Sequence, residues 1–223
     1  MVFIIIFYIL SDPLPIEIVN LPKDALKTMK LPDFPARDDS PQHEVSFSSN
    51  LFIERSDFAE DPSKVEKGFK RLMVGQSVGL KYVGYVISVK EILKDPKGNV
   101  TGLKVEVEQT TAKPKAFIHW VDQATSVPCE VRLYSRLFKS KFPEEVAKDE
   151  KDGFIKDVNE NSLVVNTIAR ADQSVKSAKP MSRFQFERHG YFCVDPDVSK
   201  EVKSGLVFNR TVELKEDKGK GGA

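Results

Sequence analysis

The chain has 223 residues, which is long enough to bury a substantial hydrophobic core in one large or two small domains. It carries 34 basic and 33 acidic residues and a formal charge of +1, so the composition excludes a general basic field around the molecule. A negatively charged partner would have to be held by a local basic patch.

The first ten residues, MVFIIIFYIL, are almost all apolar. A helix that spans a bilayer needs about 20 such residues, so we predict no membrane span and no membrane partner. The stretch has neither the basic segment before it nor the small-residue cleavage site after it that a signal peptide would have. It is therefore either a hydrophobic strand or a leader that does not belong to the domain.

Prolines punctuate residues 12–41, which predicts an extended edge and loop region with a short β-like run at residues 16–19. The KDPKGN sequence at residues 94–99 has proline and glycine where a hairpin loop needs them. Short alternating runs lie on both sides of this loop, at residues 44–48, 50–58, 77–93 and 99–109. A second set of such runs occupies residues 116–121, 129–138, 162–171, 183–195 and 205–216.

Many short strands with turn signals between them favour an all-β fold of barrels or sandwiches. The two sets of runs meet near residues 110–115, which suggests two β units of about a hundred residues each. Helix is indicated only at residues 62–70 and 143–148, for a turn or two in each case. The charged, glycine-rich tail at residues 215–223 is predicted to be disordered.

Sequence patterns typical of catalysis and metal binding are missing. The three histidines, His43, His119 and His189, are far apart and have no cysteine or carboxylate at metal-ligand spacing. The chain also lacks the motifs of a nucleophile elbow, a phosphate-binding loop and a dinucleotide-binding loop. We therefore expect no metal site and no catalytic residues in this chain.

A local basic cluster does occur, around Gly68 and Phe69. Its members are Lys64, Lys67, Lys70, Arg71 and Lys81. Cations that neutralise phosphates, beside a ring that can stack on a base, are typical of single-stranded RNA binding. The alternative is that these charges form a solvated surface without a ligand.

The stretch FQFERHGYF, residues 184–192, alternates apolar and polar side chains and then breaks the alternation. Gln185 can donate to and accept from one base edge, and Arg188 offers a rigid fork of donors. Side chains three residues apart on a regular strand face opposite ways, so both reach one ligand only where the strand bulges or ends. Gly190 can adopt such an irregular backbone. We predict that the broken alternation aims Gln185 and Arg188 at a common site.

Six stretches stand out as a spaced set: FIERSDF (52–58), GFKRL (68–72), KPKAFIHWV (113–121), CEVRLYSRLF (129–138), FQFERHGYFCVD (184–195) and LVFNRTVELKE (206–216). Together they resemble the C-terminal anticodon-binding half of glutaminyl-tRNA synthetases, most closely the eukaryotic form. The resemblance runs in order through residues 12–217, and as a set of spaced motifs it is highly specific. Residues 1–11 do not take part in it, so we expect them to be a leader foreign to the domain.

The resemblance implies two consecutive β-barrels of the ribosomal-protein-like anticodon-binding type. They would occupy residues 12–112 and 113–217, with strands that can be exchanged between the barrels, followed by a disordered tail at residues 218–223. The family grips the anticodon loop and places its bases in separate pockets. Its contacts fall here on Lys70, Arg71, Gln185 and Arg188, with Lys81 added as a neighbouring cation.

Two positions depart from the family pattern. A glutamine that precedes the Lys-Arg pair in bacterial members is Gly68 here, and an arginine in the following strand is Gly79, with Lys81 two residues further on. The contacts to the first anticodon base therefore match the family pattern less closely than the other contacts do. Within the family, His119 and Trp120 are expected to pack in or between the barrels. Arg55 is expected to pair with an acidic neighbour, Glu54 or Asp57, or to cap a loop.

The family's catalytic half, with its HIGH and KMSKS-like sequences, is not found in the chain, so we expect the chain alone not to attach glutamine to tRNA. The resemblance implies ATP and Mg as cofactors of that catalytic half, and none in this chain. It implies two partners, glutamine tRNA through its anticodon loop and the catalytic domain of the same enzyme, and leaves a multi-synthetase complex open. Without a basic, serine-rich presequence, the expected location is cytoplasmic.

Two alternatives stay open. Glutamyl-tRNA synthetases of the archaeal and eukaryotic type share the barrels, although the sequence FQFERHGYF favours the glutaminyl-tRNA synthetases. The other alternative is a stand-alone β-barrel interaction protein without tRNA specificity.

Overall fold

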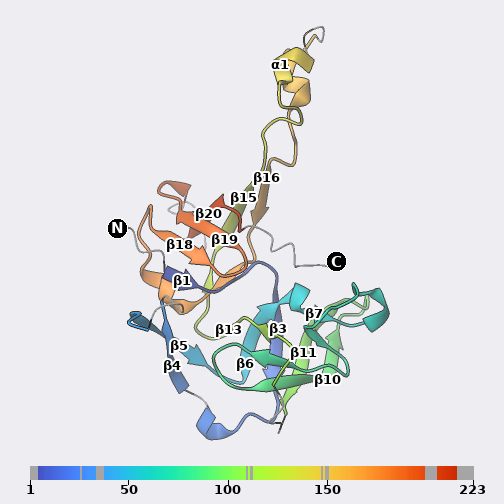
Figure 1. The fold of residues 1–223 in the computed structure, drawn as a ribbon, viewed down its shortest axis with the longest axis vertical. Coiled ribbons are helices and arrows are strands. Elements are labelled where there is room, and N and C mark those ends of the chain that lie inside the picture. The colour runs from blue at the N-terminus through green and yellow to red at the C-terminus, as the bar shows by residue number, and fades with distance from the viewer. Residues whose placement is uncertain are drawn as a thin grey trace.

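The computed structural model describes residues 5–25, 27–33, 38–108, 110, 113–146, 148, 151–198 and 205–214. Strands make up nearly all of its regular structure, and they pack around two hydrophobic cores (Figure 1). The all-β prediction is therefore confirmed. We call the two packed units the first and the second β body.

The first β body is built on a seven-stranded sheet. In spatial order its strands are β12 (Phe117–Ile118), β9 (Val78–Leu80), β10 (Val86–Lys94), β11 (Val100–Val107), β3 (Pro13–Ile18), β6 (Asn50–Glu54) and β13 (Trp120–Asp122). Leu14, Ile16 and Ile18 alternate inward from β3 and are buried, because successive side chains of a strand point to opposite faces. Two short pairs of strands complete this body: β4 (Lys27–Pro32) with β5 (Gln42–Phe47), and β7 (Phe58–Ala59) with β8 (Leu72–Met73).

The second β body is built on a six-stranded sheet. In spatial order its strands are β1 (Ile5–Phe7), β18 (Arg183–Phe186), β19 (Gly190–Val194), β20 (Val207–Val212), β15 (Glu130–Tyr134) and β16 (Leu163–Asn166). A smaller sheet contains β14 (Val127–Pro128), β17 (Arg170–Ala171) and β2 (Ile9–Leu10). Phe186, Phe192 and Phe208 are at most 2% exposed, and each buried ring contributes about 1.5 to 3 kcal/mol to folding. These rings form the centre of the second core.

Helices are few and short, as predicted. The segment at residues 62–70 holds one 3₁₀ turn, η3 (Pro62–Lys64), and the segment at residues 143–148 holds α1 (Pro143–Val146). The other 3₁₀ turns are η1 (Lys23–Ala25), η2 (Arg55–Asp57), η4 (Gly153–Asp157) and η5 (Gln173–Ser177). Figure 1 shows that α1 lies at the tip of an arm that leaves the second β body between β15 and β16. In the described part of the chain, no helix is long and apolar enough to cross a membrane.

The predicted hairpin loop at residues 94–99 joins β10 to β11. Asp95 Oδ1 accepts hydrogen bonds from the backbone N–H groups of Lys97 at 2.8 Å and Asn99 at 2.9 Å. Gly98 has a φ of +85°, a left-handed conformation that glycine adopts without steric cost. The turn chemistry read from the sequence therefore explains this loop.

The structure corrects the expected boundary at the beginning of the chain. β1 pairs with β18 in parallel, and β2 pairs with β17 in antiparallel fashion. Tyr8, Ile9 and Leu10 are at most 7% exposed and belong to the two cores. Residues 5–7 and 9–10 are thus strands of the fold and not part of a leader foreign to it, and Tyr8, Ile9 and Leu10 contribute buried side chains to the two cores. The tail at residues 218–223 lies outside the described residues.

Strands are exchanged across the boundary proposed near residue 113. β12 and β13 follow that boundary in sequence but pair with β9 and β6 in the first β body. β1 is the first strand of the described residues but lies in the sheet of the second β body. Each body therefore contains strands from both halves of the sequence, and the chain crosses repeatedly between them.

Candidate nucleic-acid interface

The candidate site begins at the turn between β18 and β19. Phe184 and Phe186 are buried on one face of β18, and Gln185 lies between them on the other face. Arg188 has a φ of +71°, which is uncommon for a residue with a Cβ atom. Gly190 has a φ of +127°, and a Cβ atom built on it would lie 2.5 Å from the carbonyl oxygen of Val212. The broken alternation is therefore a tight turn whose backbone requires glycine.

This turn presents Arg188 to the first β body. Arg188 donates from Nη1 to Oδ2 of Asp57 at 2.7 Å and from Nη2 to Oδ1 at 2.8 Å. Arg71 reaches the same carboxylate, with 3.0 Å between its Nη1 and Asp57 Oδ1, and donates to the backbone oxygen of Ser56 at 3.4 Å. Asp57 closes η2 and is 0% exposed. Two arginines, one from each body, therefore converge on one buried carboxylate.

At Asp57 itself, the guanidinium groups outnumber the carboxylates. A single carboxylate faces two guanidinium groups, and the Arg71 and Arg188 side chains stay 39% and 29% exposed. Each guanidinium has five N–H donors, of which Asp57 takes two from Arg188. The remaining guanidinium donors suit an acceptor-rich ligand.

In a second cluster, the acidic residue comes from the second β body and its basic partners come from the first. Glu187, from the turn of the second β body, accepts a hydrogen bond from Lys81 and lies 3.1 Å from Nε2 of His119. Burial acts to raise the pKa of the Glu187 carboxyl, but the adjacent His119 and Lys81 outweigh it and lower that pKa to about 2. Burial lowers the pKa of the His119 imidazole, so this ring is neutral at pH 7. Lys81, predicted as a tRNA contact, is thus already paired within the chain.

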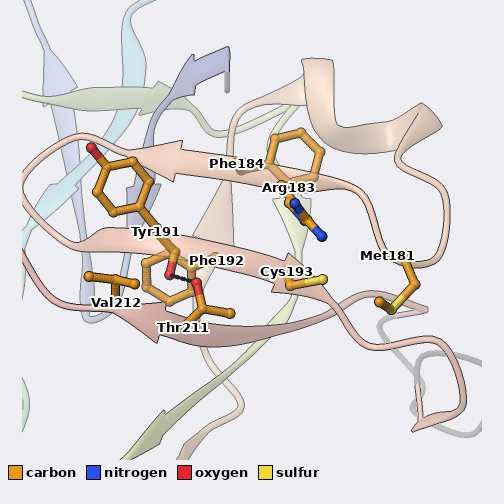
Figure 2. Close-up of a pocket in the computed structure, with 8 residues that line it drawn as sticks. All are labelled: Met181, Arg183, Phe184, Tyr191, Phe192, Cys193, Thr211 and Val212. Atoms are coloured by element: carbon orange, nitrogen blue, oxygen red, sulfur yellow. Dashed lines mark hydrogen bonds between the residues drawn. The ribbon is translucent and has the colours of Figure 1, made fainter. Parts of the chain in front are cut away.

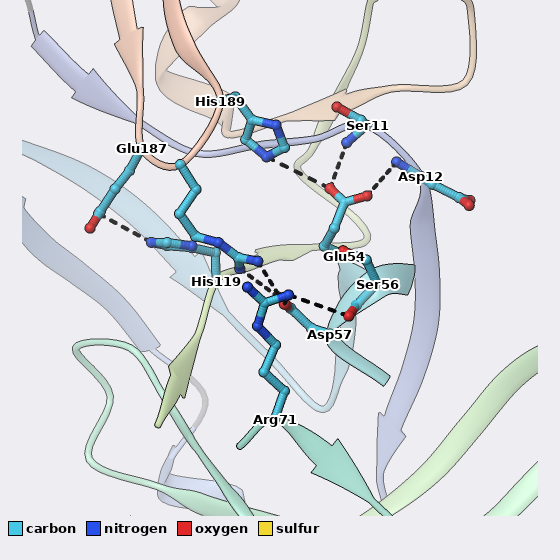
Figure 3. A network of polar contacts seen from close by, with 10 residues as sticks. Ser11, Asp12, Glu54, Ser56, Asp57, Arg71, His119, Glu187 and His189 are labelled. Carbon is cyan, nitrogen blue, oxygen red and sulfur yellow. Dashed lines mark hydrogen bonds and ion pairs between the residues drawn. The ribbon is translucent and has the colours of Figure 1, made fainter. Parts of the chain in front are cut away.

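A third contact joins His189 to Glu54. Nε2 of His189 lies 3.7 Å from Oε2 of Glu54. The same oxygen accepts the backbone N–H of Ser11 at 2.8 Å, and Oε1 of Glu54 accepts the backbone N–H of Asp12 at 2.9 Å. Burial, followed by the charge of Arg188, lowers the pKa of His189 to about 4. Burial raises the pKa of Glu54, against the two backbone donors. The junction between the bodies therefore holds an alternating set of acidic and basic groups from both sides (Figure 3).

The structure brings some of the predicted site residues together and leaves others apart. Lys70 is exposed and lines an open pocket of about 490 Å³ next to Arg71. Gln185 is half-buried, and its side chain makes no hydrogen bond to any described residue. Arg71 and Arg188 meet at Asp57. The hypothesis that Gln185 and Arg188 address a common ligand stays a prediction.

The two positions where glycine replaces a residue of the family pattern, Gly68 and Gly79, have different surroundings. At Gly68 nothing lies within 4 Å of an added Cβ atom, although the φ of +97° favours glycine. At Gly79 an added Cβ atom would lie 2.6 Å from the ring of Phe117 and 2.9 Å from Pro114. The space that a larger side chain would use in β9 is therefore filled by Phe117.

Sequence reasoning missed the acidic half of the site. It named Asp57 only as a possible partner of Arg55, but Arg55 pairs with Asp12 at 3.1 Å and donates to the backbone oxygen of Val100 at 2.8 Å. Asp57 and Arg188 are 131 residues apart, so no local pattern signals their contact. His119 packs between the bodies as expected, with its ring centroid 4.6 Å from that of Tyr8.

A larger pocket lies on the second β body and shares no residue with the junction. Figure 2 shows the pocket, which has a volume of about 540 Å³ and is lined by Met181, Arg183, Phe184, Tyr191, Phe192, Cys193, Thr211 and Val212. Its lining is mostly apolar, and Arg183 is its one charged residue. It lacks the paired charges that distinguish the junction.

Comparison with known proteins gives a consistent result. Residues 6–108 and residues 117–195 each match a family model described as tRNA synthetases class I (E and Q), anti-codon binding domain. The chain is 49% identical over 211 residues to the glutamine–tRNA ligase of Bos taurus, covering 94% of this chain and 26% of that protein. It is 44% identical over 218 residues to the probable glutamine–tRNA ligase of Drosophila melanogaster, covering 95% of this chain and 26% of that protein.

A bacterial relative shows the same likeness. The glutamine–tRNA ligase of Stutzerimonas stutzeri is 43% identical over 216 residues, covering 93% of this chain and 37% of that protein. The chain thus spans about a quarter to somewhat over a third of the length of these relatives.

Proposed function

Because the chain belongs to the family of class I E and Q tRNA synthetase anticodon-binding domains, we propose that it recognises the anticodon loop of glutamine tRNA on behalf of a glutamine–tRNA ligase. The observation that carries the proposal is the pair of family matches, which lie side by side and cover residues 6–108 and 117–195. The relatives reported above are named as glutamine enzymes, which favours glutamine over glutamate tRNA.

The junction between the two bodies supports a role in reading bases. Arg71 and Arg188 keep free guanidinium donors there, and arginine forks are well suited to base edges. Tyr82 is 40% exposed beside Lys81, whose Nζ lies 5.3 Å from the ring centroid. One side of its ring stacks on Tyr8, and in this proposal its exposed part would contact an unpaired base. Lys70 lies exposed in the neighbouring pocket, where it would contact phosphate.

We assign Gln185 to a base contact on chemical grounds, because its amide offers a donor and an acceptor and its side chain has no partner among the described residues. Lys81 has a different role in this proposal. Its charge is matched by Glu187, so it acts on RNA only through the charge balance of the junction or after that ion pair opens.

The activity of the whole enzyme goes beyond this chain. In the proposed enzyme, a catalytic domain that is not found here would use ATP and Mg to attach glutamine, and this chain alone would not. The proposed compartment is the cytoplasm, and the proposed partners are the catalytic domain of the same enzyme and a multi-synthetase complex. These extensions rest on the family resemblance alone.

Direct binding tests the proposal. The 223-residue chain should bind a glutamine tRNA transcript more tightly than the same transcript with each anticodon base changed in turn. A glutamate tRNA transcript distinguishes the related synthetase, since tighter binding to it would transfer the assignment to glutamyl-tRNA synthetases. Equal affinity for every transcript would instead indicate an interaction protein without tRNA specificity.

A further inference from the structure

The proposed function does not explain what holds the two arginines of the junction in place. Arg71 precedes β8 in the first β body, whereas Arg188 comes from the turn between β18 and β19 in the second. Both are long side chains that lose several rotatable degrees of freedom when fixed. Asp57 contacts both of them, and its carboxylate is 0% exposed, so it is not itself placed to touch RNA.

We propose that Asp57 is a positioning residue for anticodon recognition, which fixes Arg71 and Arg188 to each other across the two bodies and so determines how well they discriminate between anticodons. The inference rests on the proposed function and deepens it. Asp57 acts through the two arginines and makes no RNA contact of its own.

The geometry of the fork supports this role. The two parallel hydrogen bonds to Arg188, at 2.7 and 2.8 Å, fix both the position and the plane of the guanidinium before any ligand arrives. A donor group that is ordered in advance loses less entropy on binding, and its direction selects among base edges. Lysine in place of Arg188 would keep the charge but lose the fork.

The charge balance supports the same role. Without the carboxylate, the two guanidinium groups would repel each other across a partly buried space. Glu54 and Glu187 lie near the turn, but Glu54 is held by two backbone N–H groups and Glu187 by Lys81. Neither is free to replace Asp57 as the common partner.

The test uses Asp57→Asn in the 223-residue chain, with Asp152→Asn as a charge-matched control on the exposed arm near α1. Asparagine keeps the size of the side chain but leaves one acceptor oxygen and turns an N–H group toward the arginines. We expect weaker binding of the glutamine tRNA transcript and unchanged or tighter binding of anticodon-substituted transcripts, so that discrimination falls by about tenfold or more. The control should leave the ratio of the two affinities unchanged.

A measurement on the unmodified chain does not depend on the stability of any variant. ¹⁵N NMR of the arginine side chains in the free chain should show hindered rotation of the Arg188 and Arg71 guanidinium groups before RNA is added. Freely rotating guanidinium groups would overturn the inference. So would a folded Asp57→Asn variant, verified by thermal melting, that loses affinity equally for every transcript or keeps full discrimination. If the unmodified chain itself fails to discriminate, the proposed function fails, which is a distinct result.

Discussion

Replacing Gly190 with alanine tests whether backbone geometry holds the turn that presents Arg188. The φ of +127° lies in a region that residues with a Cβ atom rarely adopt, which costs about 1 to 3 kcal/mol. The added Cβ atom would also lie 2.5 Å from the carbonyl oxygen of Val212, and forcing an atom into a packed position costs about 1 to 3 kcal/mol more. We therefore expect Gly190→Ala to lower the free energy of unfolding by about 2 to 6 kcal/mol.

Gly98 provides the matched control for this substitution. Its φ is +85°, but no atom lies within 4 Å of an added Cβ, so Gly98→Ala should cost only the backbone term of about 1 to 2 kcal/mol. Urea titrations followed by circular dichroism would measure both variants against the unmodified chain. Equal losses at the two positions would refute the role of the close contact with Val212. A Gly190→Ala variant as stable as the unmodified chain would refute the described turn.

Three further predictions concern the core, the RNA contacts and the pH response. Phe186→Ala should lower the free energy of unfolding by about 3 to 5 kcal/mol because it empties a fully buried site, whereas Gln185→Ala should change it by less than about 0.5 kcal/mol in thermal melts. Gln185→Ala should lose about 1 to 3 kcal/mol of discrimination between the glutamine tRNA transcript and anticodon-substituted transcripts. Lys70→Ala should instead weaken the binding of all transcripts equally and reduce the slope of log affinity against log salt concentration by about one. The folded pKa of His189, about 4, is below its unfolded value of 6.5, so its contribution is fully present above pH 6.5 and is lost as the pH falls toward 4. His189→Gln should make the free energy of unfolding depend less steeply on pH between 6.5 and 4. An unchanged dependence would contradict the lowered pKa of His189.

The sequence predicted local features of the fold well. The alternation of residues 184–186 marks β18 and its buried face, and KDPKGN marks the loop between β10 and β11. These features depend on side-chain periodicity and turn chemistry, which residues adjacent in sequence determine. The apolar stretch at residues 5–10 was misjudged for the opposite reason. Its role depends on distant partners, β18 and β17, which its own composition does not reveal.

The site was predictable only in part. Chemistry alone identified Arg71, Arg188 and Gln185 as residues suited to RNA, and the family resemblance named the same positions. Their environment was not predictable, because the carboxylate of Asp57 reaches Arg188 across 131 residues of sequence. Strand alternation predicts which face a side chain occupies but not which element lies opposite that face. The assignment of individual anticodon contacts therefore stays a prediction.

The central claim is that this chain identifies its RNA through the anticodon. The most direct measurement transplants the anticodon loop of glutamine tRNA into an unrelated tRNA and compares the affinity of the 223-residue chain for the two forms of that tRNA. The account predicts that the transplanted loop confers most of the affinity shown for glutamine tRNA. An unrelated tRNA whose affinity does not change when it receives the glutamine anticodon loop would contradict it.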